Sequence, residues 1–451
     1  MGFFAKGIRL PRAVATRTLN LIDIPLPQRV VLPLRQYIGE PAKPVVKPGG
    51  KVKAGQVIAT AESDTALPLA ATISGKVSEI IERRDYQGQS VQAIIIESDG
   101  KDTHIKPPKL KKCMSSQTPD EILARIHAAG LITRGLHPLP LGKDLLPDDQ
   151  PKTHLFLTRR KVVQKIDTVI INCLDSEPSL AVNRYLSGVG HEDLAAGIAA
   201  IKNVTGAENI VFVLDKQTPP SDQFAEMVAA DEEETTIIVK RDIMRYPMGL
   251  PVPLIKAILG REVPLPYGHP RDVGVALFDL NTIISLGKVL RTHLAPVDTL
   301  ITIGGGAFSQ QGIAQVRLGT EIGALVEALG GFTQEPAKII LGGPMMGVAQ
   351  YDLTTPITRE TPGLFALTRD EIVLVGDYRE CINCGLCVKV CPVNLVPGVL
   401  SMYCAKDRFE TAEKEGLFTC IECGCCDYVC PSRRPMVHLF RHAKHQLTEG
   451  S

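Results

Sequence analysis

The sequence predicts a multidomain protein of the α/β class with a separate helical domain at its C-terminal end. At 451 residues the chain is longer than one hydrophobic core usually supports, which indicates three or four domains. Short apolar segments alternate with helical periodicity through residues 166–295, a pattern typical of a mostly parallel sheet covered by helices. The C-terminal part differs in composition, because ten of the twelve cysteines lie after residue 380.

Residues 41–105 follow a predicted N-terminal extension, 1–40, and form a small β-rich unit. Apolar and turn residues alternate there at short spacing. The pattern resembles the barrel-sandwich hybrid of biotinyl and lipoyl carrier domains, which present a modifiable lysine on a hairpin tip. The corresponding tip at 62–66 has no lysine, so we predict a rigid module and not a swinging arm.

Residues 106–295 should form the Rossmann-like parallel α/β domain, and a smaller strand–helix–strand unit should follow at 296–350 with a glycine turn at 304–306. A helical domain is predicted from 365 to 451. The strands of the larger domain are expected at 167–172, 209–214 and 235–239, and its helices at 119–129, 190–203, 220–230, 252–260 and 280–292. Further helices are expected at 320–329, 396–406 and 410–415.

Eight cysteines form two matching runs, each with spacing C-x2-C-x2-C-x3-C and each followed by proline. This spacing is typical of bacterial two-cluster ferredoxins, in which the fourth cysteine of each run ligates the other cluster. We therefore predict two [4Fe–4S] clusters with crossed fourth ligands. Cluster one takes Cys381, Cys384, Cys387 and Cys430, and cluster two takes Cys420, Cys423, Cys426 and Cys391.

Zinc is the alternative metal, but structural zinc sites use paired C-x2-C half-sites, which fit two four-cysteine runs badly. Cys425 lies beside Cys426 without the two-residue spacing. Cys404 lies in a helical pattern, and we expect it to be a packed thiol. Cys113 and Cys173 are expected to be ordinary buried cysteines.

The charge balance argues against nucleic acid as a partner. Lys and Arg total 50 against 49 Asp and Glu, whereas binding to phosphates needs a cationic excess. The cysteine usage indicates a reducing compartment. No apolar run reaches the roughly 18 residues that span a bilayer, and the N-terminus has no secretion signal. We therefore expect a cytoplasmic protein without a direct membrane span.

Several strings, in this order, resemble the RnfC family. RnfC is the cluster-bearing peripheral subunit of the Rnf ferredoxin:NAD oxidoreductase complexes. The resemblance covers nearly the whole chain and implies a soluble-ligand-binding β-grasp (SLBB) domain at 296–350. The strings lie at 38–47 (IGEPAKPVVK), 171–178 (INCLDSEP), 246–249 (YPMG), 260–264 (GREVP) and 342–347 (GGPMMG), before the two cysteine runs.

The central domain of that family, like the flavin subunit of respiratory complex I, holds FMN and NADH. Its glycine-rich loop, of the form GxGGAGFP, offers backbone N–H groups to phosphate. This chain departs from that form at 134–143 (RGLHPLPLGK), where Gly135 and Lys143 remain but the glycine cluster is gone. Pro138 and Pro140 have no N–H group.

Two further departures point the same way. Leu250 and Pro251 follow the YPMG string where the family carries Gly or Ala and then Glu, and Asp279 replaces an asparagine. Asn172, Asp175 and Glu177 stand where the family contacts flavin or nicotinamide. Because the phosphate cradle is missing, we expect Asp175 and Glu177 to cap the helix after Pro178 instead.

These features predict an electron-relay subunit with two [4Fe–4S] clusters, no catalytic residue of its own, and neither FMN nor NAD(H). NqrA, of the sodium-pumping quinone reductase, similarly lacks the glycine loop, but it also lacks the clusters. The resemblance implies peripheral attachment at the cytoplasmic face through other subunits of a membrane redox complex, with ferredoxin or another redox protein as a candidate partner. The alternatives are an NADH- or ferredoxin-linked flavoprotein subunit and a docking scaffold.

Overall fold

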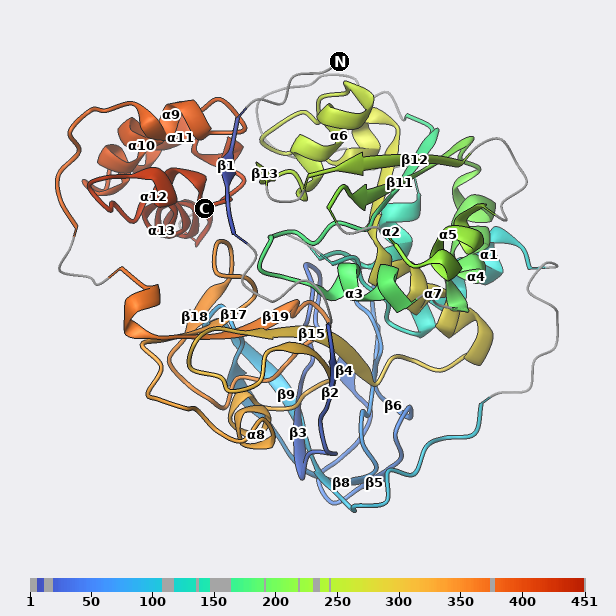
Figure 1. Ribbon diagram of the computed structural model, residues 1–451. Coiled ribbons are helices and arrows are strands. Elements are labelled where there is room, and N and C mark those ends of the chain that lie inside the picture. The colour runs from blue at the N-terminus through green and yellow to red at the C-terminus, as the bar shows by residue number, and fades with distance from the viewer. Residues whose placement is uncertain are drawn as a thin grey trace.

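The computed structural model describes residues 6–11, 19–107, 117–134, 138–146, 164–189, 192–217, 220–229, 236–242, 245–373 and 378–449 (Figure 1). The first sheets form a β-rich sandwich. One has the antiparallel order β3-β9-β8-β5 and the other β4-β6-β7. Val30, Leu32, Ile94 and Ile96 alternate along paired strands and share a core between them. The strands are β3 (Arg29–Pro33), β4 (Lys43–Pro44), β5 (Lys51–Val52), β6 (Val57–Thr60), β7 (Leu69–Ala70), β8 (Gly75–Arg84) and β9 (Ser90–Ser98).

The sandwich begins before residue 41, where we expected it to start. Strand β3 pairs with β9 from within the predicted extension. Two shorter N-terminal strands join other parts of the molecule. β1 (Ile8–Arg9) pairs with β13 (Arg245–Tyr246), and β2 (Leu21–Asp23) runs parallel to β16 (Gly312–Arg317). The N-terminal region thus ties three units together.

The central domain has a four-stranded sheet in the order β12-β11-β10-β14, and all its pairings are parallel. Both faces are buried. Val169 and Ile171 face one apolar core and Ile170 faces another, as the period of two in a strand requires. The strands are β10 (Thr168–Asn172), β11 (Asn209–Asp215), β12 (Thr236–Arg241) and β14 (Val275–Asp279).

Helices cover both faces of this sheet. Helices α1, α4 and α7 pack over one face, and α6 covers the other. The expected helices are present with small shifts at their ends, whereas α2 and α3 were not anticipated. The helices are α1 (Pro119–Ala128), α2 (Leu141–Leu145), α3 (Val182–Val189), α4 (Asp193–Thr205), α5 (Asp222–Ala229), α6 (Pro251–Leu259), the 3-10 helix η2 (Pro270–Val273) and α7 (Leu280–Thr292).

The next unit is a mixed six-stranded sheet in the order β18-β17-β19-β15-β16-β2, with α8 (Ile322–Ala328) packed on it. Its strand β19 (Gly363–Leu367) lies beyond residue 350 and reaches past the predicted start of the cluster domain at 365. The remaining strands are β15 (Asp298–Gly304), β17 (Lys338–Leu341) and β18 (Val348–Gln350), and the 3-10 helix η3 (Arg369–Glu371) follows.

The C-terminal domain is helical, as expected, and stands at one end of the molecule with β1 beside it (Figure 1). Cys404 is buried in α10, and Cys173 is buried at the end of β10, while Cys113 lies outside the described residues. Within the described ranges, no helix is both long enough and apolar enough to cross a membrane. The helices are α9 (Leu386–Val390), α10 (Pro397–Cys404), α11 (Phe409–Lys414), η5 (Leu417–Thr419), α12 (Cys425–Val429) and α13 (Met436–Glu449).

Candidate iron–sulfur site and the neighbouring flavin-type site

The two cysteine runs follow the same backbone path. Asn383 and Glu422, each two residues after the first cysteine of its run, both have φ 55°. Gly385 (φ 72°) and Gly424 (φ 75°) then start α9 and α12 from the left-handed region, which glycine enters without strain. The two runs are therefore structural repeats and not merely repeats of spacing.

Each repeat turns its first cysteine toward backbone donors. The N–H group of Asn383 lies 3.5 Å from Cys381 Sγ, and that of Glu422 lies 3.4 Å from Cys420 Sγ. The N–H group of Leu395 lies 3.3 Å from Cys391 Sγ. Donors of this kind stabilise thiolates and the negative charge of a cluster.

The thiols of the first run gather around the start of α10. A Cβ atom at Gly398 would lie 3.5 Å from Cys387 Sγ and 3.8 Å from Cys381 Sγ, both ordinary contact distances, so both thiols lie beside this residue. Cys384 is exposed on the same loop. Burial raises the pKa of the Cys387 thiol, and the neighbouring Cys381 and Cys384 add to that rise.

Val390, the neighbour of Cys391 in the chain, packs in one apolar cluster with Cys423 and Cys425 of the second run. The Cys391 thiol is buried, and burial raises its pKa first, with the charge of Cys423 as a further cause. Cys430 and Cys387 each pack against the core of the helical domain. Within the described residues, no three Cys, His, Asp or Glu side chains converge as ligands of a single metal ion do.

Cys425 and Cys426 face different surroundings. Cys426 packs into the core of the helical domain, whereas Cys425 lies in a separate apolar cluster with Tyr246 and Leu250 of the central domain. Burial raises the pKa of Cys426 far above its usual value. Cys426 thus faces the core of the helical domain, and Cys425 faces the central domain.

The second run forms the contact between the helical domain and the rest of the molecule. The Tyr246 hydroxyl donates to the Cys423 carbonyl at 2.6 Å, and both residues are buried. Met345 lies close to Gly424, and its carbonyl oxygen would be 2.9 Å from a Cβ atom there. Sequence reasoning missed Tyr246 as a site residue, because its partner is 177 positions away in the chain.

A charged network reinforces this contact. Glu422 accepts from Arg441 at 2.8 Å and from Lys444 at 2.7 Å. Arg441 also donates to the Met346 carbonyl at 2.7 Å. The cations hold the pKa of Glu422 below its usual value although burial opposes them.

Glu177 connects the network to the central domain. Its buried carboxylate accepts from the N–H groups of Met345 and Met346, both at 2.9 Å, and burial raises its pKa to about 7. Our expectation that Glu177 caps the helix after Pro178 was therefore wrong, because its partners lie in a loop of the six-stranded unit.

Asp175 does cap that helix. It accepts from the N–H groups of Asn183 and Arg184 in the first turn of α3, at 2.9 and 3.4 Å. Asn172 is also occupied, since its side chain donates to the Gly249 carbonyl at 2.9 Å and accepts from the Leu174 N–H group at 3.1 Å. These polar groups are thus bonded within the protein.

In the altered loop at 134–143, backbone N–H groups donate to other groups of the protein. Residues 135–137, including Gly135, Leu136 and His137, lie outside the described residues. In the described part, the Leu139 N–H group donates to the Thr133 hydroxyl and the Leu141 N–H group to the Leu131 carbonyl. Lys143 is exposed on the short helix α2. The described donors are therefore not directed at a phosphate.

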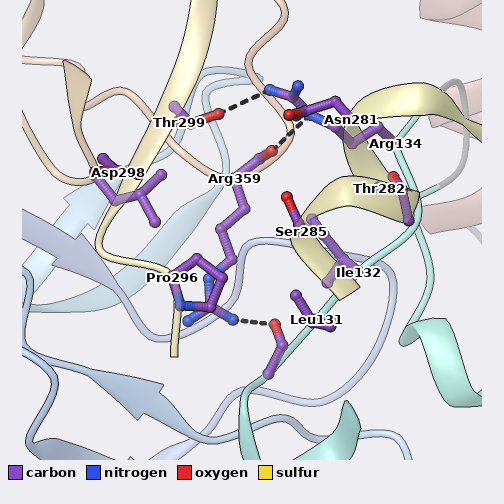
Figure 2. A pocket seen from close by; sticks show the side chains of 12 residues that line it. Leu131, Ile132, Arg134, Asn281, Thr282, Ser285, Pro296, Asp298, Thr299 and Arg359 are labelled. Carbon is purple, nitrogen blue, oxygen red and sulfur yellow. Dashed lines mark hydrogen bonds between the residues drawn. The ribbon is translucent and has the colours of Figure 1, made fainter. Parts of the chain in front are cut away.

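Arg134 extends from this loop into the six-stranded unit. Its guanidinium donates to the Arg359 carbonyl at 3.1 Å and to the Thr299 hydroxyl at 3.0 Å (Figure 2). It also donates to the Thr361 carbonyl at 2.9 Å. Burial lowers its pKa. The sequence showed an arginine inside the glycine-loop segment, but it gave no sign of these partners.

The pocket beside Arg134 is small. Its volume is about 50 Å³, and Arg359, Thr282 and Asp298 are among the residues that line it (Figure 2). Sites for cofactor-sized ligands occupy roughly 300 to 1,000 Å³. Asp279, where the family has asparagine, accepts from the Thr282 N–H group at 2.9 Å as the N-cap of α7. This pocket is too small for a flavin nucleotide.

Four family models match consecutive parts of the chain and confirm the predicted fold class. They are the RnfC barrel sandwich hybrid domain at residues 3–101, the Nuo51 FMN-binding domain at 150–288, the SLBB domain at 300–349 and the 4Fe-4S binding domain at 374–396.

Curated relatives match over nearly the whole chain. The C subunit of the Na(+)-translocating ferredoxin:NAD(+) oxidoreductase complex of Acetobacterium woodii is 32% identical, over 99% of this chain and 97% of the relative. The corresponding subunit of the proton-translocating complex of Clostridium ljungdahlii is 33% identical over 87% of this chain and 82% of the relative. That of the ion-translocating oxidoreductase complex of Rhodobacter capsulatus is 31% identical over 96% and 81%.

Identity above 30% over 81–97% of the length of these relatives confirms the resemblance that the ordered strings and cysteine runs predicted, and the chain belongs to the RnfC family of Rnf-complex subunits.

Proposed function

We propose that this subunit relays single electrons through two [4Fe–4S] clusters between a donor and the membrane-associated part of an Rnf-type complex. The observation that supports the proposal is the repeated cysteine loop, together with the packing of Val390, next to Cys391, in one apolar cluster with Cys423 of the other repeat. Crossed ligation of this kind holds two clusters close together. When bound, the clusters supply one-electron chemistry, while the protein supplies the thiolates, the N–H donors and the burial that tune them.

The two sites differ in their position. The first run lies on an exposed loop, whereas the second run is buried against the central domain at Tyr246 and Met345. We propose that cluster one exchanges electrons with a partner outside this chain and that cluster two lies on the inner side of the relay. Other subunits of the complex would be the permanent partners.

Anaerobically purified protein should contain about eight iron atoms per chain, because eight thiolates form two four-iron sites. Iron and sulfide analysis, together with electron paramagnetic resonance of the reduced protein, measures this. Two interacting paramagnets are expected. One or two zinc atoms per chain without visible absorbance would overturn the proposal.

We further propose that the chain works without FMN or NADH of its own. The described loop has no free phosphate cradle, and the neighbouring pocket is too small. The second candidate function is a flavoprotein subunit, and the match to the Nuo51 FMN-binding domain favours it.

Equilibrium dialysis decides between these two candidates. We expect neither FMN nor NADH to bind at micromolar concentration. We also expect the Asp279→Asn variant to bind neither compound, because removing one negative charge cannot supply the missing N–H donors. Stoichiometric micromolar binding of either compound would establish the flavoprotein function and return Asn172, Asp175, Glu177 and Lys143 to the set of functional residues.

A further inference from the structure

A pocket larger than the one beside Arg134 lies between the β-rich sandwich and the six-stranded unit. Its volume is about 510 Å³, and small-molecule sites occupy roughly 300 to 1,000 Å³. One wall is the hairpin of β8 and β9, and the other is the segment at 348–356, which begins with β18. The Gln350 side chain donates to the Tyr86 carbonyl at 2.9 Å, where the hairpin meets this segment (Figure 1). The lining residues belong neither to the cysteine runs nor to the altered loop at 134–143.

Two arginines at the end of β8 line this pocket. The Arg83 Nε atom is buried and has no hydrogen-bond acceptor within the part of the chain that the structure describes. Arg84 donates to the Gly88 carbonyl at 3.3 Å, a long distance for such a bond. A buried donor without an acceptor costs free energy, which an acceptor on a ligand would recover. The pocket therefore has unused cationic donors.

The acids in the same pocket already have hydrogen-bond partners. Asp352 accepts from the N–H and hydroxyl groups of Thr354 at 2.8 and 2.7 Å, and these bonds hold its pKa below the usual value. Asp85 accepts from two N–H groups of the turn between β8 and β9, both at 2.9 Å. Glu82 accepts from the Ser90 hydroxyl at 2.8 Å. An anionic ligand would therefore meet free donors at the arginines and carboxylates that are already bonded.

Aromatic residues line both walls. Tyr86 packs against the core of the six-stranded unit, and its hydroxyl accepts from the Gln87 amide at 2.7 Å. Tyr351, on the other wall, is 84% exposed. A tyrosine with so little packing can turn over a ligand without losing contacts of its own, and aromatic rings pack well on flat apolar groups. The pocket thus combines a cationic part with aromatic surface.

We propose that this pocket binds a small planar molecule that carries one carboxylate or phosphate group. The Arg83 guanidinium would receive the anionic group, because charge-assisted hydrogen bonds to oxyanions are strong and directional. Tyr351 would cover the planar part from the solvent side. Since the two walls belong to different domains, the bound molecule would also hold the sandwich and the six-stranded unit together. The site is independent of the relay, because no cysteine lines it.

Isothermal titration of the intact, cluster-containing chain with three small probes tests the proposal. The probes are phenyl phosphate, benzoate and benzyl alcohol, which share a ring and differ in charge. We expect saturable binding of at least one of the two anions at one site per chain, and the tighter anion identifies the group as phosphate or carboxylate. Benzyl alcohol should not bind. The absence of saturable binding by both anions, or equal binding of benzyl alcohol, would overturn the proposal.

Two variants locate the binding in this pocket. Arg83→Gln should raise the dissociation constant of the bound anion about tenfold or more, because it removes the charged donor. Tyr351→Ser should weaken binding of the same anion but leave inorganic phosphate and acetate, which lack the ring, unaffected. Lys76→Gln is the matched control, since it removes a cation from the same strand outside the pocket.

The control should bind like the wild type. Loss of affinity in Lys76→Gln equal to that in Arg83→Gln would mean that the anions bind to general positive charge, which refutes the site. Wild-type affinity in both pocket variants would refute it as well. If Arg83→Gln does not fold, Tyr351→Ser decides, because that side chain is exposed and its loss leaves the core intact.

Discussion

Cys391→Ser should remove the cluster that the other cysteine run holds. Cys391 belongs to the first run by sequence, but it is buried, and its neighbour Val390 packs in one apolar cluster with Cys423 of the second run. Replacing the fourth thiolate with a hydroxyl weakens a site built for four sulfur ligands, so iron should fall from about eight toward about four atoms per chain. The loss is measured by iron analysis and by electron paramagnetic resonance after reduction.

Two reference variants identify which cluster is lost. Cys384→Ser lies in the first run and Cys423→Ser in the second, and neither is a fourth ligand. The spectrum of Cys391→Ser should match that of Cys423→Ser, and the spectrum of Cys430→Ser should match that of Cys384→Ser. The reverse matching would mean that each run holds its own cluster, which would refute the crossed assignment while the relay stands.

Cys404→Ser provides the matched control for a cysteine change inside the same domain. Cys404 is buried in α10 and packs in the core with Leu400 and Phe440, outside both runs. We expect this variant to keep its full iron content and both signals. Loss of a cluster in this control would show that repacking of the core, and not loss of a ligand, explains the other variants.

Local patterns were sufficient for much of the fold. The buried strands β10 and β11 are continuous apolar segments, and α7 begins at an aspartate N-cap, so each is visible within a few residues of sequence. The cysteine spacing was equally local, and the repeated φ values show that spacing and backbone conformation go together. Features set by neighbours in sequence were therefore predicted well.

Long-range contacts were not predictable in this way. Glu177 comes directly before Pro178 and a helix, which suggests a cap, but its donors are Met345 and Met346 in another domain. Strand β1 has two residues and no measurable periodicity, and it exists because β13 pairs with it. The interface at Tyr246 likewise depends on where the second repeat docks. Such features follow from assembly of the domains and not from local propensity.

The second large effect is expected at Gly287, where α4 and α7 cross with their backbones nearly in contact. A Cβ atom at Gly287 would lie 1.8 Å from the Asp193 carbonyl oxygen, and one at Gly197 would lie 2.2 Å from that of Ile283. Since the obstacles are backbone atoms, no rotamer change can relieve the clash. Gly287→Ala should force the helices apart and lower the free energy of unfolding by about 3 kcal/mol or more. Urea unfolding followed by far-UV circular dichroism measures this in a chain without tryptophan.

Gly323→Ala is the matched control, because Gly323 is also a helical glycine, in α8. A Cβ atom there would lie 3.5 Å from Leu353, an ordinary contact distance. Alanine favours a helix over glycine by about 1 kcal/mol, so this variant should unfold at the same or slightly higher urea concentration. The opposite signs of two identical substitutions separate the close α4–α7 crossing from any general effect of Gly→Ala. Equal unfolding midpoints in the two variants would show that α4 and α7 can move apart at little cost. The close crossing would then not be what fixes the position of α7 and its N-cap, Asp279.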